Sequence, residues 1–114
     1  MDDSKGFYYY LDKIISDLQF VERHLKGISY SEFVSDDLLN CSVCFKFVQA
    51  SENSKKISKT LTGLSPDIPW NQMNGLRNRI VHDYGGVQLD VVYDAAVNDV
   101  PKLLKELEKL NSGK

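Results

Sequence analysis

The segment from Arg77 to Tyr84 carries a concentration of side chains that could do chemistry. It holds Arg77, Arg79, His82 and Tyr84, and two glycines follow at positions 85 and 86. A guanidinium offers a planar fork of donors that matches phosphate oxygens. Histidine is the side chain whose ordinary pKa allows it to give or take a proton near neutral pH. The segment could therefore hold a phosphodiester, stabilise its charge and move its protons.

Each of these residues also has a simpler structural explanation. Arg77 and Arg79 could be exposed helix residues, and His82 could be a helix-terminal histidine favoured by the helix dipole. Asn78 lies one turn before His82, where it could orient the ring or be an ordinary polar surface residue. Asp83 fits a helix end better than a catalytic acid. The spacing alone favours these simpler explanations.

Length and composition predict one small globular domain that spans residues 1–114. The chain has 114 residues, 42% of them hydrophobic and 26% charged, as is ordinary for a single domain. Its formal net charge of -2 argues against a protein that coats nucleic acid by bulk electrostatics, so any RNA contact must be local. No apolar run approaches a membrane span and the N-terminus lacks a signal-peptide pattern, so we expect a cytoplasmic protein.

Cys41 and Cys44 form a Cys-x-x-Cys pair, which could be a redox motif or half of a metal site. A zinc site would need two more ligands, and neither His24 nor His82 stands at a zinc-type spacing from the pair. A redox motif would follow a strand, whereas residues 36–39 look like a helix start. We therefore expect ordinary helix packing for both cysteines, and no metal or cofactor.

Apolar spacing in the first half predicts helices. A first long helix should end at Gly27, because its apolar residues recur in steps of three and four. Ser29 and Glu32 fit a capping box that opens a short helix. A second long helix should then run from Ser35 or Asp36 to Gly63. The stripe of the first helix consists of Phe7, Leu11, Ile14, Leu18, Val21 and Leu25.

The second half also reads as helical after a break at residues 65–69. Pro69 suits the first turn of a helix with Trp70, Met73, Leu76 and Ile80 on its buried side. The glycines at 85 and 86 should end it, and a final helix should begin near residue 90, kinked or broken at residue 101. No segment alternates like a strand over a useful length. We predict an all-α, up-and-down bundle of four to five helices.

A family resemblance extends over nearly the whole chain. Arg77, four residues, His82, one residue and Tyr84 together resemble the Arg-x-x-x-x-His-x-Tyr signature of the HEPN superfamily. The run from Ser65 to Tyr84 looks like the HepT branch of that superfamily, and the resemblance implies the HEPN bundle fold. Further matching pieces are Gly86-Val87, Asp99-Val100-Pro101, and Tyr10-Leu11 followed by Ile14.

The resemblance implies a small ribonuclease toxin, paired with a nucleotidyltransferase antitoxin of the MNT type in a type II or type VII system. It implies that Arg77 and His82 are the catalytic pair, facing a cleft shared by two subunits. RNA would be cleaved through its own 2′-hydroxyl without a metal, and the antitoxin would attach AMP to Tyr84. The alternative is a catalytically silent HEPN binding module that serves as partner or substrate of a nucleotidyltransferase. The intact Arg77, His82 and Tyr84 favour the enzyme.

Helix geometry gives a separate reason to expect a symmetric homodimer. On an ideal helix Arg77 and His82, five residues apart, project about 140° away from each other. Their head groups therefore cannot easily meet on one phosphate within a single subunit. A two-fold axis could place both residues of two subunits along one cleft.

One departure from the HepT pattern lies in the second long helix. Many relatives carry a Gly-Glu-Ala box where this chain has Ser51-Glu52-Asn53, so the acid is kept and the small neighbours are not. The departure bears on how closely helices pack there and on how an antitoxin docks. The lysines that follow could line an RNA-binding rim, although such a run is more often a solvated face. They are Lys55, Lys56 and Lys59.

Overall fold

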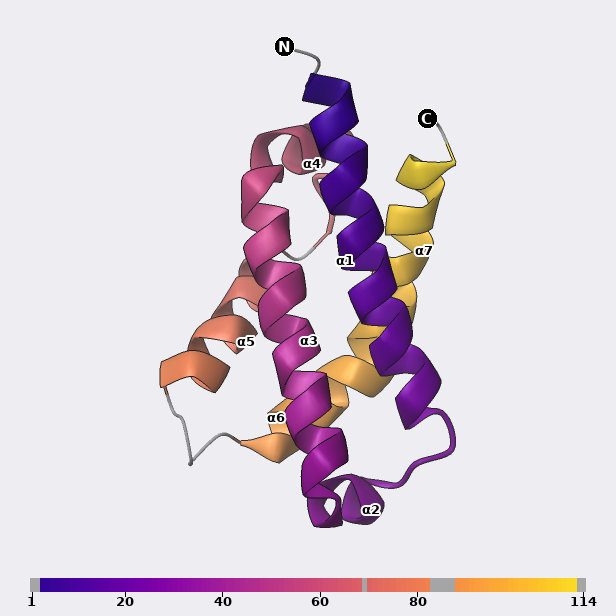
Figure 1. Ribbon diagram of the computed structural model, residues 1–114, viewed down its shortest axis with the longest axis vertical. Helices are drawn as coiled ribbons and strands as arrows, with labels where there is room; N and C mark the ends of the chain where they lie inside the picture. Colours follow the sequence, from indigo (N-terminus) through magenta and orange to yellow (C-terminus); the bar gives the residue numbers. More distant parts are fainter. Residues whose placement is uncertain (1–2, 69, 83–87, 113–114) are drawn as a thin grey trace.

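The computed structural model describes residues 3–68, 70–82 and 88–112, and all regular structure in these ranges is helical. This confirms the predicted all-α fold. Four long helical stretches form the bundle, with two short helices between them (Figure 1). In chain order the elements are α1 (Asp3–Leu25), α2 (Tyr30–Ser35), α3 (Asp37–Lys56), α4 (Ser58–Leu64), α5 (Trp70–His82), α6 (Leu89–Asp94), the π-helical segment η1 (Ala95–Asp99) and α7 (Val100–Asn111).

Helix α1 forms the centre of the bundle and packs against both α3 and α7 (Figure 1). The stripe predicted from its spacing is buried: Leu11, Ile14, Leu18 and Val21 are all fully inaccessible to solvent. Burying one such side chain contributes about 1.5–3 kcal/mol. The apolar face of α1 is therefore a main source of the stability that holds the remaining helices in place.

The connection from α1 to α2 follows the sequence prediction closely. Gly27 has a φ of 76°, a left-handed conformation that glycine adopts without a steric penalty. The Glu32 N–H donates to the Ser29 hydroxyl at 3.1 Å, and the Ser29 N–H donates to the Glu32 carboxylate at 3.0 Å. This is the expected capping box, and it fixes the start of α2.

The second long helix is shorter than predicted. It was expected to continue to Gly63, but α3 ends at Lys56 and a separate helix, α4, begins at Ser58. Ile57 lies between them with φ -128° and ψ 21°, outside the helical region, and its N–H donates to the Ser54 carbonyl three residues back. The resulting bend lets both Ile57 and Leu61 point into the core, where they are 8% and 0% exposed.

Pro101 distorts the last helical stretch, as its position predicted. A proline lacks the N–H that would bond to the carbonyl four residues back, and its ring clashes with that carbonyl. The turn before it opens into the π-helical segment η1, in which the Val100 N–H donates to the Ala95 carbonyl five residues back. Pro101 itself lies in the first turn of α7.

The cysteines of α3 differ in environment. Both thiols are free; Cys41 is exposed, whereas Cys44 packs against the core. Burial raises the pKa of Cys44 to about 11, and the neighbouring Cys41 adds to this effect. None of the helices in the described ranges is long and apolar enough to cross a membrane.

Candidate active site

Helix α5 carries every described residue of the predicted site, and its three faces have different neighbours. Met73 and Leu76 are buried and hold the helix against the bundle. At about 100° per residue, Arg77 projects on the flank nearest α3, and Arg79 on the opposite flank. His82 lies at the end of the helix and is exposed to solvent. Packing of the apolar face thus fixes where each polar side chain points.

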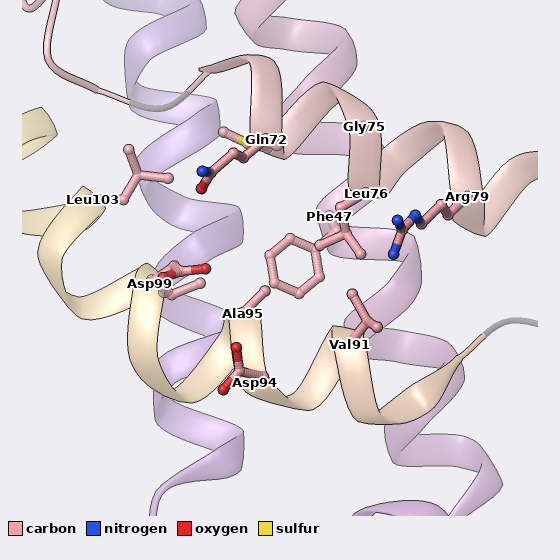
Figure 2. A pocket seen from close by; sticks show the side chains of 12 residues that line it. Phe47, Gln72, Gly75, Leu76, Arg79, Val91, Asp94, Ala95, Asp99 and Leu103 are labelled. Carbon is pink, nitrogen blue, oxygen red and sulfur yellow. The ribbon is translucent and has the colours of Figure 1, made fainter.

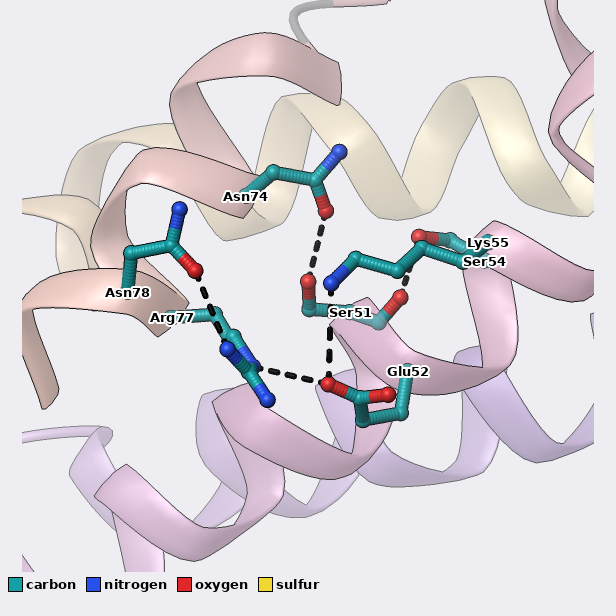
Figure 3. A network of polar contacts seen from close by, with 7 residues as sticks. All are labelled: Ser51, Glu52, Ser54, Lys55, Asn74, Arg77 and Asn78. Carbon is teal, nitrogen blue, oxygen red and sulfur yellow. Dashed lines mark hydrogen bonds and ion pairs between the residues drawn. The ribbon is translucent and has the colours of Figure 1, made fainter. Parts of the chain in front are cut away.

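Arg77 is held against α3 by a carboxylate. Its Nε lies 2.7 Å from an Oε1 of Glu52, and its Nη1 donates to the side-chain oxygen of Asn78 at 3.0 Å (Figure 3). The Arg77 side chain is 23% exposed and that of Glu52 is 42% exposed. Two of the guanidinium nitrogens therefore fix the side chain, while Nη2 has no recorded partner in the described part of the chain.

A second polar contact one turn earlier fastens α5 to α3. The hydroxyl of Ser51, which is fully buried, donates to the side-chain oxygen of Asn74 at 2.6 Å (Figure 3). Ser54 in turn donates to the Ser51 carbonyl at 2.7 Å. Ser51, the first residue of the departing box, is thus small enough for close packing and adds a hydrogen bond between the helices.

The lysines that follow Ser51-Glu52-Asn53 have different neighbours. Lys55 lies 3.7 Å from Glu52, so it adds positive charge to the Glu52–Arg77 pair. Lys56 instead lies over the ring of Tyr10 on α1, 5.5 Å from its centroid. Of the proposed RNA-binding rim, Lys55 is therefore the member next to the predicted site.

Helix geometry separates Arg77 from His82 within one chain. Arg77 is turned towards α3, and His82, five positions further along α5, projects about 140° away from it on an ideal helix and is exposed. Asn78 contacts Arg77, not His82, through its side-chain oxygen. Arg79 lines a cavity on the far flank of the helix. Asp83 and Tyr84 lie outside the described residues.

Sequence reasoning missed the partners of Arg77 and Asn74. Glu52 was singled out as the retained acid of a box, but nothing in its spacing links it to Arg77, which lies on another helix. Likewise, no local pattern pairs Ser51 with Asn74. Both contacts arise only when α3 packs against α5.

Comparison with known proteins identifies the family. Residues 14–110 match the family described as Ribonuclease HepT-like. The chain belongs to this family. The HepT-like match covers α3 and α5 completely, and with them the Arg77–Glu52 pair and His82.

Named relatives of this HepT-like chain agree with the family match. The chain is 30% identical to "Probable ribonuclease HepT" of Thermococcus cleftensis over 89% of its own length and 92% of the relative's. It is 31% identical to "Putative RNase MJ1380" of Methanocaldococcus jannaschii over 93% of its own length and 94% of the relative's. No solved structure matches the chain. The predicted membership of the HepT branch is therefore confirmed.

Proposed function

We propose that this HepT-like chain is a metal-independent endoribonuclease toxin whose active site is completed by a second copy of itself. The observation that carries the proposal is that Arg77 and His82 lie on different sides of α5. Glu52 holds Arg77 towards α3, while His82 is exposed on another side of the same helix. A phosphate that meets both side chains therefore calls for an Arg77 and a His82 from different subunits.

An apolar stripe on α3 supports the homodimer. Leu38 and Phe45 are 81% and 57% exposed, and apolar side chains that form one patch on a surface can mark an interface. They precede Glu52 at successive intervals of seven residues, so all three lie along nearly the same side of α3. A second copy that covers Leu38 and Phe45 would approach along the side of α3 that carries the Glu52–Arg77 pair.

The chemistry follows from the two side chains. In the proposed step the 2′-oxygen of RNA attacks the adjacent phosphorus, the bond to the 5′-oxygen breaks, and a 2′,3′-cyclic phosphate and a 5′-hydroxyl result. His82 takes the proton of the 2′-hydroxyl, and the leaving 5′-oxygen takes a proton from water. Arg77 stabilises the charge that gathers on the phosphate oxygens.

Replacing His82 tests this assignment directly. His82→Ala should lower the rate of RNA cleavage by about 100-fold or more, because general acid–base catalysis contributes that much. The wild-type reaction should persist in excess chelator and leave 2′,3′-cyclic phosphate ends, measured by gel and mass spectrometry. His24→Ala, another exposed histidine near a helix end, is the matched control and should cleave normally. Cleavage that chelator abolishes and magnesium restores would contradict the proposal.

We also propose that a nucleotidyltransferase of the MNT type acts as antitoxin in the cytoplasm by attaching AMP to Tyr84. The sequence places Tyr84 two residues after His82. An added phosphate there could pair with Arg77 or Arg79 and exclude RNA from the site. Mass spectrometry after incubation with ATP and the transferase should find AMP on wild-type protein and none on Tyr84→Phe. Tyr30→Phe, an exposed tyrosine on α2, is the control; AMP retained on the Tyr84→Phe protein would refute the assignment.

A further inference from the structure

A cavity of about 360 Å³ lies beside the flank of α5 that faces away from Glu52. Figure 2 shows it between α5 and the α6–η1–α7 stretch, with the ring of Phe47 from α3 among the side chains that line it. Its walls are mostly apolar, whereas Arg79, Asp94 and Asp99 bring charge to it from opposite sides. This size and this combination of an apolar floor with a few polar groups are typical of small-molecule sites.

The π-helical segment gives the cavity its acidic wall. Asp94 directly precedes η1 and Asp99 ends it, five residues later. In an α-helix residues five apart are turned by about 140° from each other, so only one of them could face the cavity. The wider π turn joins residues five apart and returns Asp99 to nearly the side of Asp94. Both residues line the cavity as a result.

The charged side chains around the cavity have donor and acceptor atoms that are available to a ligand. In the described part of the chain Arg79 makes no ion pair with either aspartate. Asp94 accepts one hydrogen bond at 2.6 Å, from the Asn98 side chain, and Asp99 has no recorded partner among the described residues. The cavity thus offers carboxylate acceptors on one side and a guanidinium on the other, with an apolar surface between them.

The cavity adjoins the proposed cleavage site through α5. Arg79 and His82 are three residues apart, so their Cβ atoms lie within about 5–6 Å of each other. We propose that the cavity is a nucleobase subsite that receives a guanine of the RNA substrate next to the cleaved phosphate. This inference rests on the proposed ribonuclease function and adds the base that the enzyme selects.

Guanine fits the described groups better than the other bases, because adenine and cytosine each place a ring nitrogen acceptor beside the amino group. The N1–H and amino group of guanine donate from one edge, and two carboxylates can accept both. Uracil has one N–H between two carbonyl oxygens, which the carboxylates would repel. The planar base can lie against the apolar side chains of the floor, while Arg79 pairs with a phosphate oxygen of the same nucleotide.

Mononucleotide binding to the full-length wild-type protein tests the proposal without any cleavage step. Calorimetry with GMP, AMP, CMP and UMP should give the tightest binding for GMP and a weakening of about tenfold or more for UMP, the discrimination expected of a paired base edge. The double variant Asp94→Asn, Asp99→Asn should lose this preference. Glu108→Gln removes one charge from an exposed site on α7 and should keep it.

A second variant tests whether the nucleotides bind in this cavity. Ala95 lines the cavity, and Ala95→Leu should fill part of it and weaken all four nucleotides, with folding checked by circular dichroism. Equal affinity for GMP and UMP, or a GMP preference that survives the double variant, would overturn the subsite. Selective GMP binding by a protein that does not cleave RNA would overturn the proposed function and leave the subsite standing.

Discussion

The pairing of Glu52 with Arg77 constrains the chemistry more than any other contact of a single side chain in the site. A free arginine side chain samples many rotamers, and ordering it for a phosphate costs entropy. The 2.7 Å contact with Glu52 and the 3.0 Å bond to Asn78 order the side chain before RNA arrives. Glu52 thereby acts as a positioning residue: it acts through Arg77 and not on the phosphate.

Glu52→Gln should therefore slow cleavage without unfolding the protein. Both partners are partly exposed, so the lost ion pair should lower the free energy of unfolding by no more than about 1 kcal/mol. A less ordered Arg77 should lower kcat by about tenfold and change KM little, since positioning contributes in the transition state. Steady-state kinetics and a thermal melt measure the two effects.

The matched control for Glu52→Gln is Glu106→Gln on α7. Glu106 also forms an ion pair, with Lys109 at 3.3 Å, but the pair lies on another helix and is mostly exposed. The kcat of the Glu106→Gln protein should equal that of the wild type. A Glu52→Gln protein with unchanged kcat would show that Glu52 does not position Arg77.

For the helices, patterns among residues close in sequence predicted the structure better than patterns among distant residues. The stripe of α1, the capping box of α2 and the distortion before Pro101 all depend on neighbours within a few residues, and all were predicted. The break at Ile57 was not predicted, because it depends on tertiary packing: the bent backbone allows both Ile57 and Leu61 to be buried in the core. The partner of Arg77 was missed for the same reason, since α3 and α5 meet only in the folded chain.

The capping box of α2 should make stability depend on pH. Hydrogen bonds from the Ser29 N–H and side chain lower the pKa of Glu32. A lowered folded-state pKa adds stability above the unfolded-state pKa, and this stability is lost as the pH falls through the folded-state value. Glu32→Gln should therefore lower the Tm at pH 7 and have little effect at pH 3, measured by thermal melts. Glu22→Gln, on α1, is the control, and an equal Tm loss at both pH values would contradict this account.

In the whole molecule, the helical bundle forms a stable scaffold on which the polar side chains of α5 are partly or fully exposed. Helix α1 packs against α3 and α7 (Figure 1), and the side chains that α5 adds to the buried core of the described ranges, Met73 and Leu76, are both apolar. Arg77 and His82 can therefore serve a site that one chain does not complete. The exposed Leu38 and Phe45 on α3 are the surface that we expect a second chain to cover.

Mixing two inactive variants tests the shared active site most directly. Arg77→Ala and His82→Ala should each be nearly inactive alone, because each homodimer lacks one kind of catalytic group. When the two are unfolded together, refolded and assayed for RNA cleavage, mixed dimers bring an Arg77 from one chain to a His82 from the other. We predict that activity returns to a level far above the sum of the separate variants. A mixture as inactive as its components, with dimers shown to have exchanged, would contradict the shared site.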